Sequence, residues 1–320
     1  MVRFNPKARL DRSRIRERGR GSSAGGLGGA GMRLPIPSGA AGGGCGSIVL
    51  LVVIVGVMLL VQQCGGVNIP VLPGGTDDAG SGADTSQRYG ECVSGEDANA
   101  SQDCARVAVE NSLTDYWEGE LGDRFEAISA INTFSGSVGT ECGNAGSDVG
   151  PFYCPADRGI YLDTTFFDTV LERQLGGPDG GFVEFYVLAH EYGHHISNLL
   201  GFMGQVESQQ GATSDATRLE LQADCYAGMW VRHATTTEDE GGEGLITDIT
   251  EEDLRLALEA ASAVGDDTIQ RKTGQQVNPE TWNHGSSEQR MHWFDVGYEQ
   301  GDLDACDTFS ASESEVLGQG

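Results

Sequence analysis

Hydrophobic side chains recur every three or four residues in five segments of the chain, and this spacing places them on one face of an α-helix. In the second segment Phe182, Phe185, Ala189 and Ile196 fall near one face, and Gly201 is placed to cap the helix C-terminus. The predicted helices cover 104–121, 182–200, 214–233, 251–264 and the stretch that follows Ser286 and Ser287.

Two shorter segments have the composition of β-strands. They cover 125–134 and 159–162, and the sequence Asp157-Arg158-Gly159 is typical of a turn. The pattern therefore predicts a mainly helical domain with a few short strands.

One long stretch of the chain, 34–76, has no charged side chain, and within it 48–61 is a continuous apolar run. With the uncharged residues before it, the segment 40–61 reaches 22 residues, and a membrane-spanning helix needs about 20. We predict a retained signal anchor here. A cleaved signal peptide is the alternative, although its leader is ordinarily shorter.

The segments around this anchor differ in composition, and they predict how the chain is organised. Basic residues precede the apolar run, so the positive-inside rule predicts a cytoplasmic N-terminus and an exported remainder, held at the cell membrane by a single span. The expected parts are a basic, glycine-rich cytoplasmic arm (1–39), the anchor (40–61), a flexible stalk (62–90), a domain (91–310) and a disordered tail (311–320).

Charge is distributed unevenly along the chain. Residues 1–33 carry nine basic and two acidic side chains, whereas the whole chain has a net charge of −28. Residues 34–320 therefore carry −35. A segment with this much negative charge repels phosphate backbones, which argues against nucleic acid as a partner.

Six cysteines lie in the part that we expect to be exported, and an even number there indicates disulfides. Fifteen pairings are possible for six cysteines. Two pairs would close short loops and leave a third. The expected pairs are Cys92–Cys104, Cys142–Cys154 and Cys225–Cys306. A zinc–thiolate cluster is the alternative, but the sequence has no C-x-x-C spacing to support it.

The sequence His190-Glu191-Tyr192-Gly193-His194 is an H-E-x-x-H motif on a predicted helix. Residues four apart share a helix face, so His190 and His194 can bind one metal ion. Glu191 then lies beside them, where a carboxylate can take a proton from water. His195 points about 100° away from His194, and we expect it at the surface or in support of a ligand.

A catalytic zinc site needs a third protein ligand and an open position. Glu220 is the candidate for that ligand, and Asp224, four residues later on the next predicted helix, would accept the free N–H of a ligand histidine. A solvated acidic face is the alternative, but apolar residues surround both carboxylates in the sequence.

Hydrolysis at such a site also needs a polar group opposite the metal to stabilise an oxyanion. His284, on a predicted loop just before a helix, is the candidate, and Tyr226 is a weaker one. For a single histidine an ordinary surface or core role is an equal alternative. We expect no site role for His233 and His292.

Four stretches of sequence carry a family resemblance. In order and spacing they resemble the neutral zinc metallopeptidases, a family of bacterial, membrane-anchored proteins with an H-E-x-x-H motif, and the match extends from about 92 to 309. The stretches are GPFYCPADRGIYLDTTFF (150–167), HEYGHHISNLLG (190–201), RLELQADCYAGMW (218–230) and WNHGSSEQRMHWFDVGYEQGD (282–302).

The resemblance implies a zincin-like α+β domain of the gluzincin type, with a short sheet above the H-E-x-x-H helix. The basic arm, the anchor and the stalk lie outside the match, and the anchor predicted above would precede the domain as one transmembrane helix. The resemblance makes His190, His194 and Glu220 the ligands of one zinc ion and Glu191 the catalytic base. It also implies an edge strand that binds extended peptide, which we place at 160–163. The acidic stretch 235–250 looks like a local insertion.

The function predicted from these observations is hydrolysis of peptide bonds in a peptide or protein substrate by a zinc-activated water. A zinc hydrolase that acts on cell-wall peptide or amide bonds is one alternative, and a non-catalytic module held together by zinc is another. Nothing in the sequence predicts the substrate or the oligomeric state.

Overall fold

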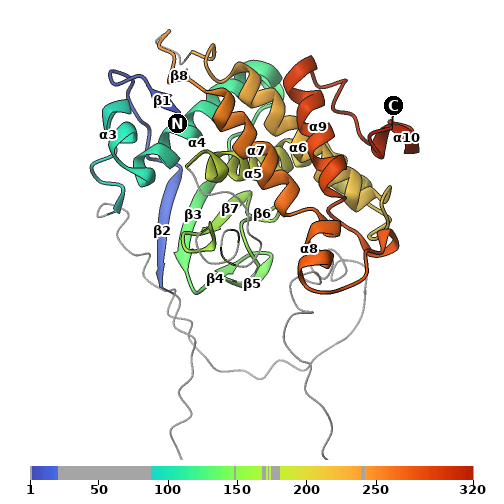
Figure 1. Cartoon of the computed structure of the whole chain (residues 1–320). Helices are drawn as coiled ribbons and strands as arrows, with labels where there is room; N and C mark the ends of the chain where they lie inside the picture. The colour runs from blue at the N-terminus through green and yellow to red at the C-terminus, as the bar shows by residue number, and fades with distance from the viewer. Residues whose placement is uncertain are drawn as a thin grey trace, which may run out of the picture.

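Long α-helices make up most of the fold (Figure 1). The structure, a computed structural model, describes residues 2–20, 88–147, 149–167, 171, 173, 181–238 and 242–319. Its longest described helices are α4 (Gln102–Leu121), α5 (Gly181–Leu199), α6 (Asp215–His233), α7 (Glu251–Ala263) and α9 (Ser287–Gln300). The first four begin and end within two residues of a predicted helix, and α9 begins where the fifth was expected, so these predictions are confirmed.

Shorter helical segments lie before, between and after the long helices. They are α3 (Gly95–Ala100), α8 (Asp266–Lys272), α10 (Glu313–Val316), and the 3₁₀ turns η1 (Gly122–Arg124), η3 (Phe202–Gln205) and η4 (Pro279–Thr281). Side-chain hydroxyls begin several helices. Ser214 accepts a hydrogen bond from Thr217 N at the start of α6, and Ser286 and Thr250 form capping boxes at α9 and α7.

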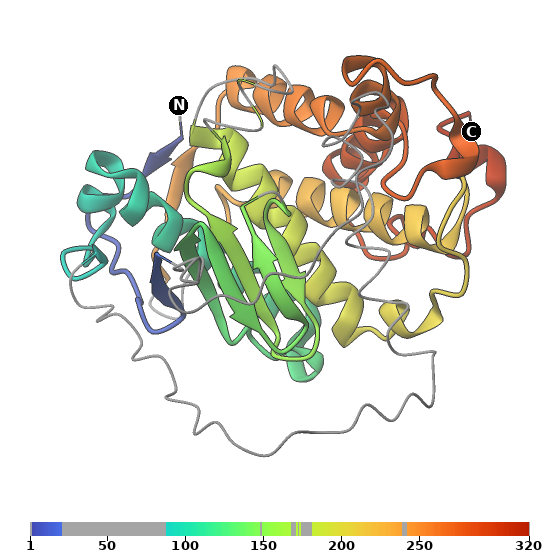
Figure 2. The ribbon, with the colours of Figure 1, turned by 90° about the horizontal axis from the view of Figure 1, so that it is seen from below.

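A four-stranded sheet lies against α5 (Figure 2). Its strand order is β2-β3-β7-β6, with β2, β3 and β7 parallel and β6 antiparallel to β7. Two two-stranded sheets pair β1 with β8 and β4 with β5. The strands are β1 (Arg3–Phe4), β2 (Ile15–Arg20), β3 (Ala130–Ser135), β4 (Ser137–Thr140), β5 (Gly143–Gly146), β6 (Phe152–Cys154), β7 (Gly159–Asp163) and β8 (Ile246–Asp248).

The strand predictions require two corrections. The strand expected at 125–134 begins only at Ala130, and 125–129 is irregular chain between the turn η1 and β3. The segment 160–163 belongs to β7, which pairs with β3 on one side and β6 on the other. This strand is bonded to β3 along its whole length and to β6 over 159–161, so β7 lies inside the sheet and the expectation that it is the edge strand is wrong. The edges of this sheet are β2 and β6.

Glycines allow the three central helices to pack closely. A Cβ atom on Gly193, inside the H-E-x-x-H motif, would lie 2.9 Å from the Ala223 backbone of α6. A Cβ on Gly297 of α9 would lie 1.9 Å from the Cys225 carbonyl oxygen, also on α6. Neither position has room for a side chain, so glycine is the residue that lets α5 and α9 come this close to the backbone of α6.

The N-terminal segment is part of the folded domain. We expected 1–39 to form a separate arm, but residues 2–20 pack against the rest of the chain through β1 and β2, and Phe4 and Ile15 are buried. The separation of this part of the arm from the domain was therefore wrong. Its apolar side chains are sparse among eight basic ones, so periodicity did not reveal them.

The predicted anchor (40–61) and nearly all of the predicted stalk (62–90) lie outside the described residues. Among the helices that the structure does describe, none combines the length and the hydrophobicity needed to cross a bilayer.

Two further segments are more ordered than expected. The tail 311–320 contains α10, whose Val316 is fully buried and accepts a hydrogen bond from Gln289 Nε2 at 3.0 Å. The acidic stretch 235–250 contains β8, which pairs with β1. A few apolar residues in each polar stretch, such as Ile246, are enough to fix it to the core.

All three expected disulfides are present. Cys92–Cys104 and Cys142–Cys154 close loops with a sequence separation of 12 residues, and Cys225–Cys306 joins α6 to the C-terminal segment across 81 residues. The third therefore braces the helix that carries Glu220.

Candidate metal centre

Two histidines of α5 point the same way. His190 and His194 are one helical turn apart, their ring centroids are 4.8 Å apart, and their planes are nearly perpendicular at 84°. Both are buried, at 6% and 8% exposure. Two imidazoles in this arrangement can share a ligand.

That shared partner is Glu220 of α6. Its Oε2 lies 3.3 Å from His190 Nε2, and its Oε1 lies 3.4 Å from His194 Nε2. One ligand atom from each of the three residues can be chosen so that all lie within 4.8 Å of one another, and all three residues are buried. The structure therefore brings together the three residues expected to bind metal.

The spacing of these atoms fits a tetrahedral zinc ion. Ligands that lie about 2.0–2.1 Å from such an ion are separated from one another by about 3.3 Å. The two nitrogen–oxygen distances, 3.3 Å to Oε2 and 3.4 Å to Oε1, are of this size, although they involve different oxygens of Glu220. A charge-assisted hydrogen bond is shorter, at about 2.7–2.9 Å. Two imidazole nitrogens and one carboxylate are also a donor set found in zinc enzymes.

Glu191 lies next to this group on α5 and is only 7% exposed. Burial raises the pKa of its carboxyl group and Glu220 acts in the same direction, while His194 and His190 oppose them. A carboxylate with a raised pKa is a stronger base than an ordinary glutamate. Glu191 therefore has the position and the basicity of a proton acceptor.

Asp224 fixes the orientation of His190. Its Oδ1 lies 2.8 Å from His190 Nδ1, so it accepts the N–H there and leaves Nε2 with a free lone pair on the side of Glu220. Burial raises the pKa of Asp224, but Arg290 and His190 outweigh that effect and lower it to about 2. In turn, burial lowers the pKa of His190, and Asp224 more than compensates, raising it to about 10 in the absence of a metal ion. The lone pair of Nε2 therefore becomes available when a metal ion displaces the proton on that nitrogen.

Two other residues complete the surroundings of Asp224. Arg290 of α9 donates from Nε to Oδ2 at 2.7 Å and from Nη2 to Oδ1 at 3.0 Å. The Tyr186 hydroxyl donates to Oδ1. Asp224 is completely buried, so these donors replace the water that a buried carboxylate would otherwise need.

His284 lies on the loop before α9 and is held by Asp266, the first residue of α8. Asp266 Oδ1 is 3.2 Å from His284 Nδ1, and Oδ2 accepts the backbone N–H groups of Asn283, His284 and Gly285 at 2.8–3.1 Å. Burial lowers the pKa of His284, but Asp266 and then Glu220 raise it. The effect of Glu220 indicates an electrostatic interaction between its carboxylate and the His284 imidazole.

The remaining candidates lie elsewhere. His195 is fully buried rather than at the surface, with Nδ1 3.0 Å from the Tyr153 hydroxyl and Nε2 2.6 Å from the Glu126 carbonyl oxygen. It joins α5 to the edge strand β6. Tyr226 lies six residues after Glu220, on another face of α6, and packs edge-to-face against Trp117 with centroids 5.4 Å apart.

Three residues that contribute to the centre were not predicted: Tyr186, Asp266 and Arg290. Tyr186 lies one turn before His190 among the apolar residues of α5, where the sequence alone indicates only a packing role. Arg290 is the one basic residue at a buried position of α9, and a buried arginine requires an acidic partner. That signal could have paired it with Asp224. The sequence around Asp266 gave no such signal.

Comparisons with known proteins agree with this geometry. A family model described as "Putative neutral zinc metallopeptidase" matches residues 6–309. The uncharacterized protein Rv2575 of Mycobacterium tuberculosis is 47% identical over 258 residues, which cover 80% of this chain and 86% of that protein. The uncharacterized protein YpfJ of Escherichia coli K12 is 32% identical over 312 residues, or 96% and 99% of the two chains. No solved structure matches.

Proposed function

Because the chain belongs to the neutral zinc metallopeptidase family, we propose that it is a zinc-dependent hydrolase of peptide bonds, with the zinc ion held by His190, His194 and Glu220. The observation that carries the proposal is the convergence of two Nε2 atoms and one carboxylate, at 3.3 and 3.4 Å, directly beside Glu191. A site that only stabilised the fold would need no buried carboxylate next to its ligands.

Each residue then has a distinct chemical role. A zinc ion bound by these ligands would polarise the substrate carbonyl and make a water molecule ionise near neutral pH. Glu191 accepts the proton of that water as it attacks the peptide carbon, and it delivers a proton to the leaving amine. His284 donates a hydrogen bond from Nε2 to the carbonyl oxygen as negative charge develops there.

The tautomer of His284 follows from its contact with Asp266. An aspartate beside Nδ1 keeps a proton on that nitrogen, and the raised pKa of His284 favours the state in which Nε2 is protonated as well. Only a protonated Nε2 can donate to an oxyanion. Asp266 thus both orients the ring and keeps it a donor.

We also propose that the domain that carries the metal centre works outside the cytoplasm. Three disulfides support this location, because thiols in the cytosol are kept reduced. A location beside the cell wall makes cell-wall amide bonds a second candidate substrate class. The activity assay therefore includes purified cell wall.

The test is cleavage-site mapping with the purified full chain. Peptides from a digested proteome and purified cell wall are incubated with the chain, with its Glu191→Gln variant and with the matched Glu288→Gln variant. We expect new peptide ends from the wild type and Glu288→Gln only, and none after a chelator. Product from cell wall alone would replace the peptidase proposal with an amidase. Full activity of Glu191→Gln would contradict the role of Glu191.

A further inference from the structure

The N-terminal arm, residues 2–20, is bound along its length by the body, the described residues from 88 onward. Strand β1 pairs with β8, Arg9 forms an antiparallel bridge with Ser94, and β2 pairs with β3 in the register Ile15↔Ile131 to Arg20↔Ser135. Backbone pairing at three separate places fixes both the direction and the register of the arm.

Two asparagines of the body also bind the backbone of the arm. Asn99 donates to the Phe4 carbonyl at 2.8 Å and accepts the Phe4 N–H at 3.0 Å. Asn111 donates to the Asp11 carbonyl at 2.8 Å and accepts the Asp11 N–H at 2.7 Å. Each amide thus satisfies both backbone groups of one residue, as a neighbouring strand would.

The body is built to receive this segment. A Cβ atom on Gly95 would lie 1.9 Å from the Asn5 carbonyl oxygen, so the arm passes where only glycine leaves room. Phe4 packs edge-to-face against Phe185 of α5, with ring centroids 6.1 Å apart. The arm buries five apolar side chains: Val2, Phe4, Ala8, Leu10 and Ile15.

A buried charge depends on the arm as well. Glu110 of α4 is only 1% exposed, and Arg14 Nε lies 2.6 Å from its Oε1. Its other hydrogen bonds in the described structure come from neutral groups, Asn111 Nδ2 and the Thr114 hydroxyl, so the arm supplies the cation that compensates this buried charge. An ion pair that loses one partner leaves an uncompensated charge, which is strongly destabilising.

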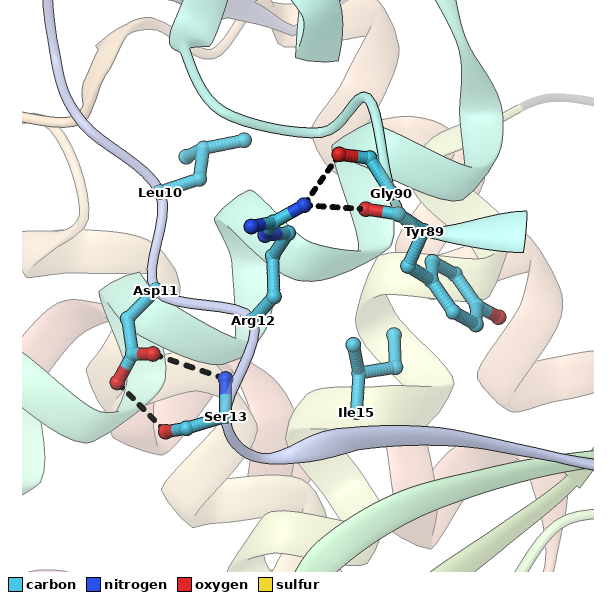
Figure 3. A pocket seen from close by; sticks show the side chains of 7 residues that line it. All are labelled: Leu10, Asp11, Arg12, Ser13, Ile15, Tyr89 and Gly90. Atoms are coloured by element: carbon cyan, nitrogen blue, oxygen red, sulfur yellow. Dashed lines mark hydrogen bonds between the residues drawn. The ribbon is translucent and has the colours of Figure 1, made fainter. Parts of the chain in front are cut away.

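The arm also contacts the first residues of the body. Figure 3 shows the Arg12 guanidinium reaching the carbonyl oxygens of Tyr89 and Gly90, where the described chain resumes. Nearby, Arg88 Nη1 lies 3.7 Å from Glu17 Oε1 of β2. The body is therefore bonded to the arm from its first described residues.

From these contacts we infer that the arm and the body occupy the same compartment, so that no membrane separates the N-terminus from the metal centre. A chain that crossed a bilayer once between residues 20 and 88 would place about 30 Å of hydrocarbon between groups that lie 2.6–3.7 Å apart here. Exchange of arms between two copies does not change this, because both copies insert in the same direction.

The basic residues of the arm fit this arrangement. Basic residues indicate a cytoplasmic N-terminus only when their function is to keep the arm in the cytoplasm. In the structure Arg14 neutralises Glu110, Arg12 binds carbonyl oxygens and Arg18 Nε donates to Asn132 Oδ1 at 2.8 Å. A basic arm also complements an acidic body.

Cysteine labelling in cells that express the full chain tests the inference. Cys45 and Cys64 are replaced by serine, and one reporter is added in the arm (Lys7→Cys) or in α4 (Glu120→Cys), both at exposed positions. A membrane-impermeant maleimide is applied to intact spheroplasts and, as the reference for full labelling, to detergent-lysed ones. We expect the two reporters to behave alike in intact spheroplasts. Labelling of one reporter only would overturn the inference.

A neighbouring position tests docking in the same preparation. Ala8 is 3% exposed, whereas Lys7 is exposed. In the lysed sample we expect Ala8→Cys to label at least tenfold more slowly than Lys7→Cys, and at the same rate after denaturation. Equal rates in the native chain would show that the arm is not docked and would overturn the inference. Neither result depends on whether the chain is a peptidase.

Discussion

Asp224 holds His190 by the nitrogen that faces away from the metal site, with Nδ1 and Oδ1 2.8 Å apart. One hydrogen bond therefore selects the tautomer that leaves Nε2 free, 3.3 Å from Glu220. The motif supplies the imidazole, but a residue on another helix determines which of its nitrogens can bind zinc.

Replacement of Asp224 by asparagine should weaken zinc binding. The amide keeps the shape but removes the negative charge that fixes the N–H of His190, and losses at such positions are typically about 10- to 100-fold in metal affinity. Competition with a zinc chelator measures the change. Asp123→Asn, at an exposed position of η1, is the matched control. Equal zinc affinity of the two variants would contradict the role of Asp224.

The contact between Asp266 and His284 makes a prediction about turnover. His284→Ala should lower kcat by about 10²- to 10³-fold, because a donor to the oxyanion is lost. Asp266→Asn should lower kcat by a smaller factor, because His284 is present but no longer held as a donor. Both variants should keep the zinc content of the wild type. Loss of zinc with loss of activity would instead make the pair structural.

The ion pair between Arg14 and Glu110 predicts a pH-dependent stability. Arg14→Ala should cost about 3–5 kcal/mol at neutral pH, the usual result of leaving a buried charge without its partner. Burial already raises the pKa of Glu110 above 4.5 even though Arg14 lowers it, so folding takes up a proton at this site. Stability therefore falls as pH rises from the ordinary pKa of glutamate through the raised one.

Because Arg14 lowers the pKa of Glu110, Arg14→Ala raises that pKa further, and Glu110 becomes neutral at a higher pH. The loss of unfolding free energy caused by Arg14→Ala should therefore shrink as the pH is lowered towards 4.5. Urea unfolding at several pH values measures it. Adding Glu110→Gln to Arg14→Ala should restore part of the loss at neutral pH. A cost that is the same at every pH, with no recovery in the double variant, would contradict the assignment.

The disulfides predict an order of stabilities. Replacing Cys225 and Cys306 by serine should cost more than replacing Cys92 and Cys104, because the sequence separations are 81 and 12 residues. The chain-entropy model puts the difference at about 1.5–2 kcal/mol. Urea unfolding of the two double variants gives the comparison. The reverse order would indicate that the long bridge does not brace α6.

Local patterns predicted what short stretches of sequence determine. Helix spacing gave the bounds of α4 to α7, and residues four apart on one helix gave both the histidine pair and the Glu220–Asp224 pair. The disulfide pairs followed from loop length. The family resemblance contributed the zinc assignment and the general fold, which the α+β architecture and the buried ligand group support.

Long-range contacts were not predictable in the same way. The sequence pattern predicts that Val2 and the other apolar residues of the arm belong to a solvated basic segment. Nothing nearby in the sequence indicates that β1 pairs with β8 and β2 with β3. Asp266 and Arg290 acquire their roles only when the fold places them beside His284 and Asp224. The sequence analysis placed the sheet edge at β7, whereas β6 is the edge in the structure, because strand order depends on tertiary pairing.

The most direct test of the central claim is zinc K-edge X-ray absorption on the purified full chain, combined with metal content by mass spectrometry. We predict one zinc per chain, two imidazole nitrogens and additional oxygen ligands at about 2.0–2.2 Å, and loss of the metal in Glu220→Ala but not in Glu288→Gln. Sulfur ligands, or a zinc content that Glu220→Ala leaves unchanged, would contradict the assigned centre.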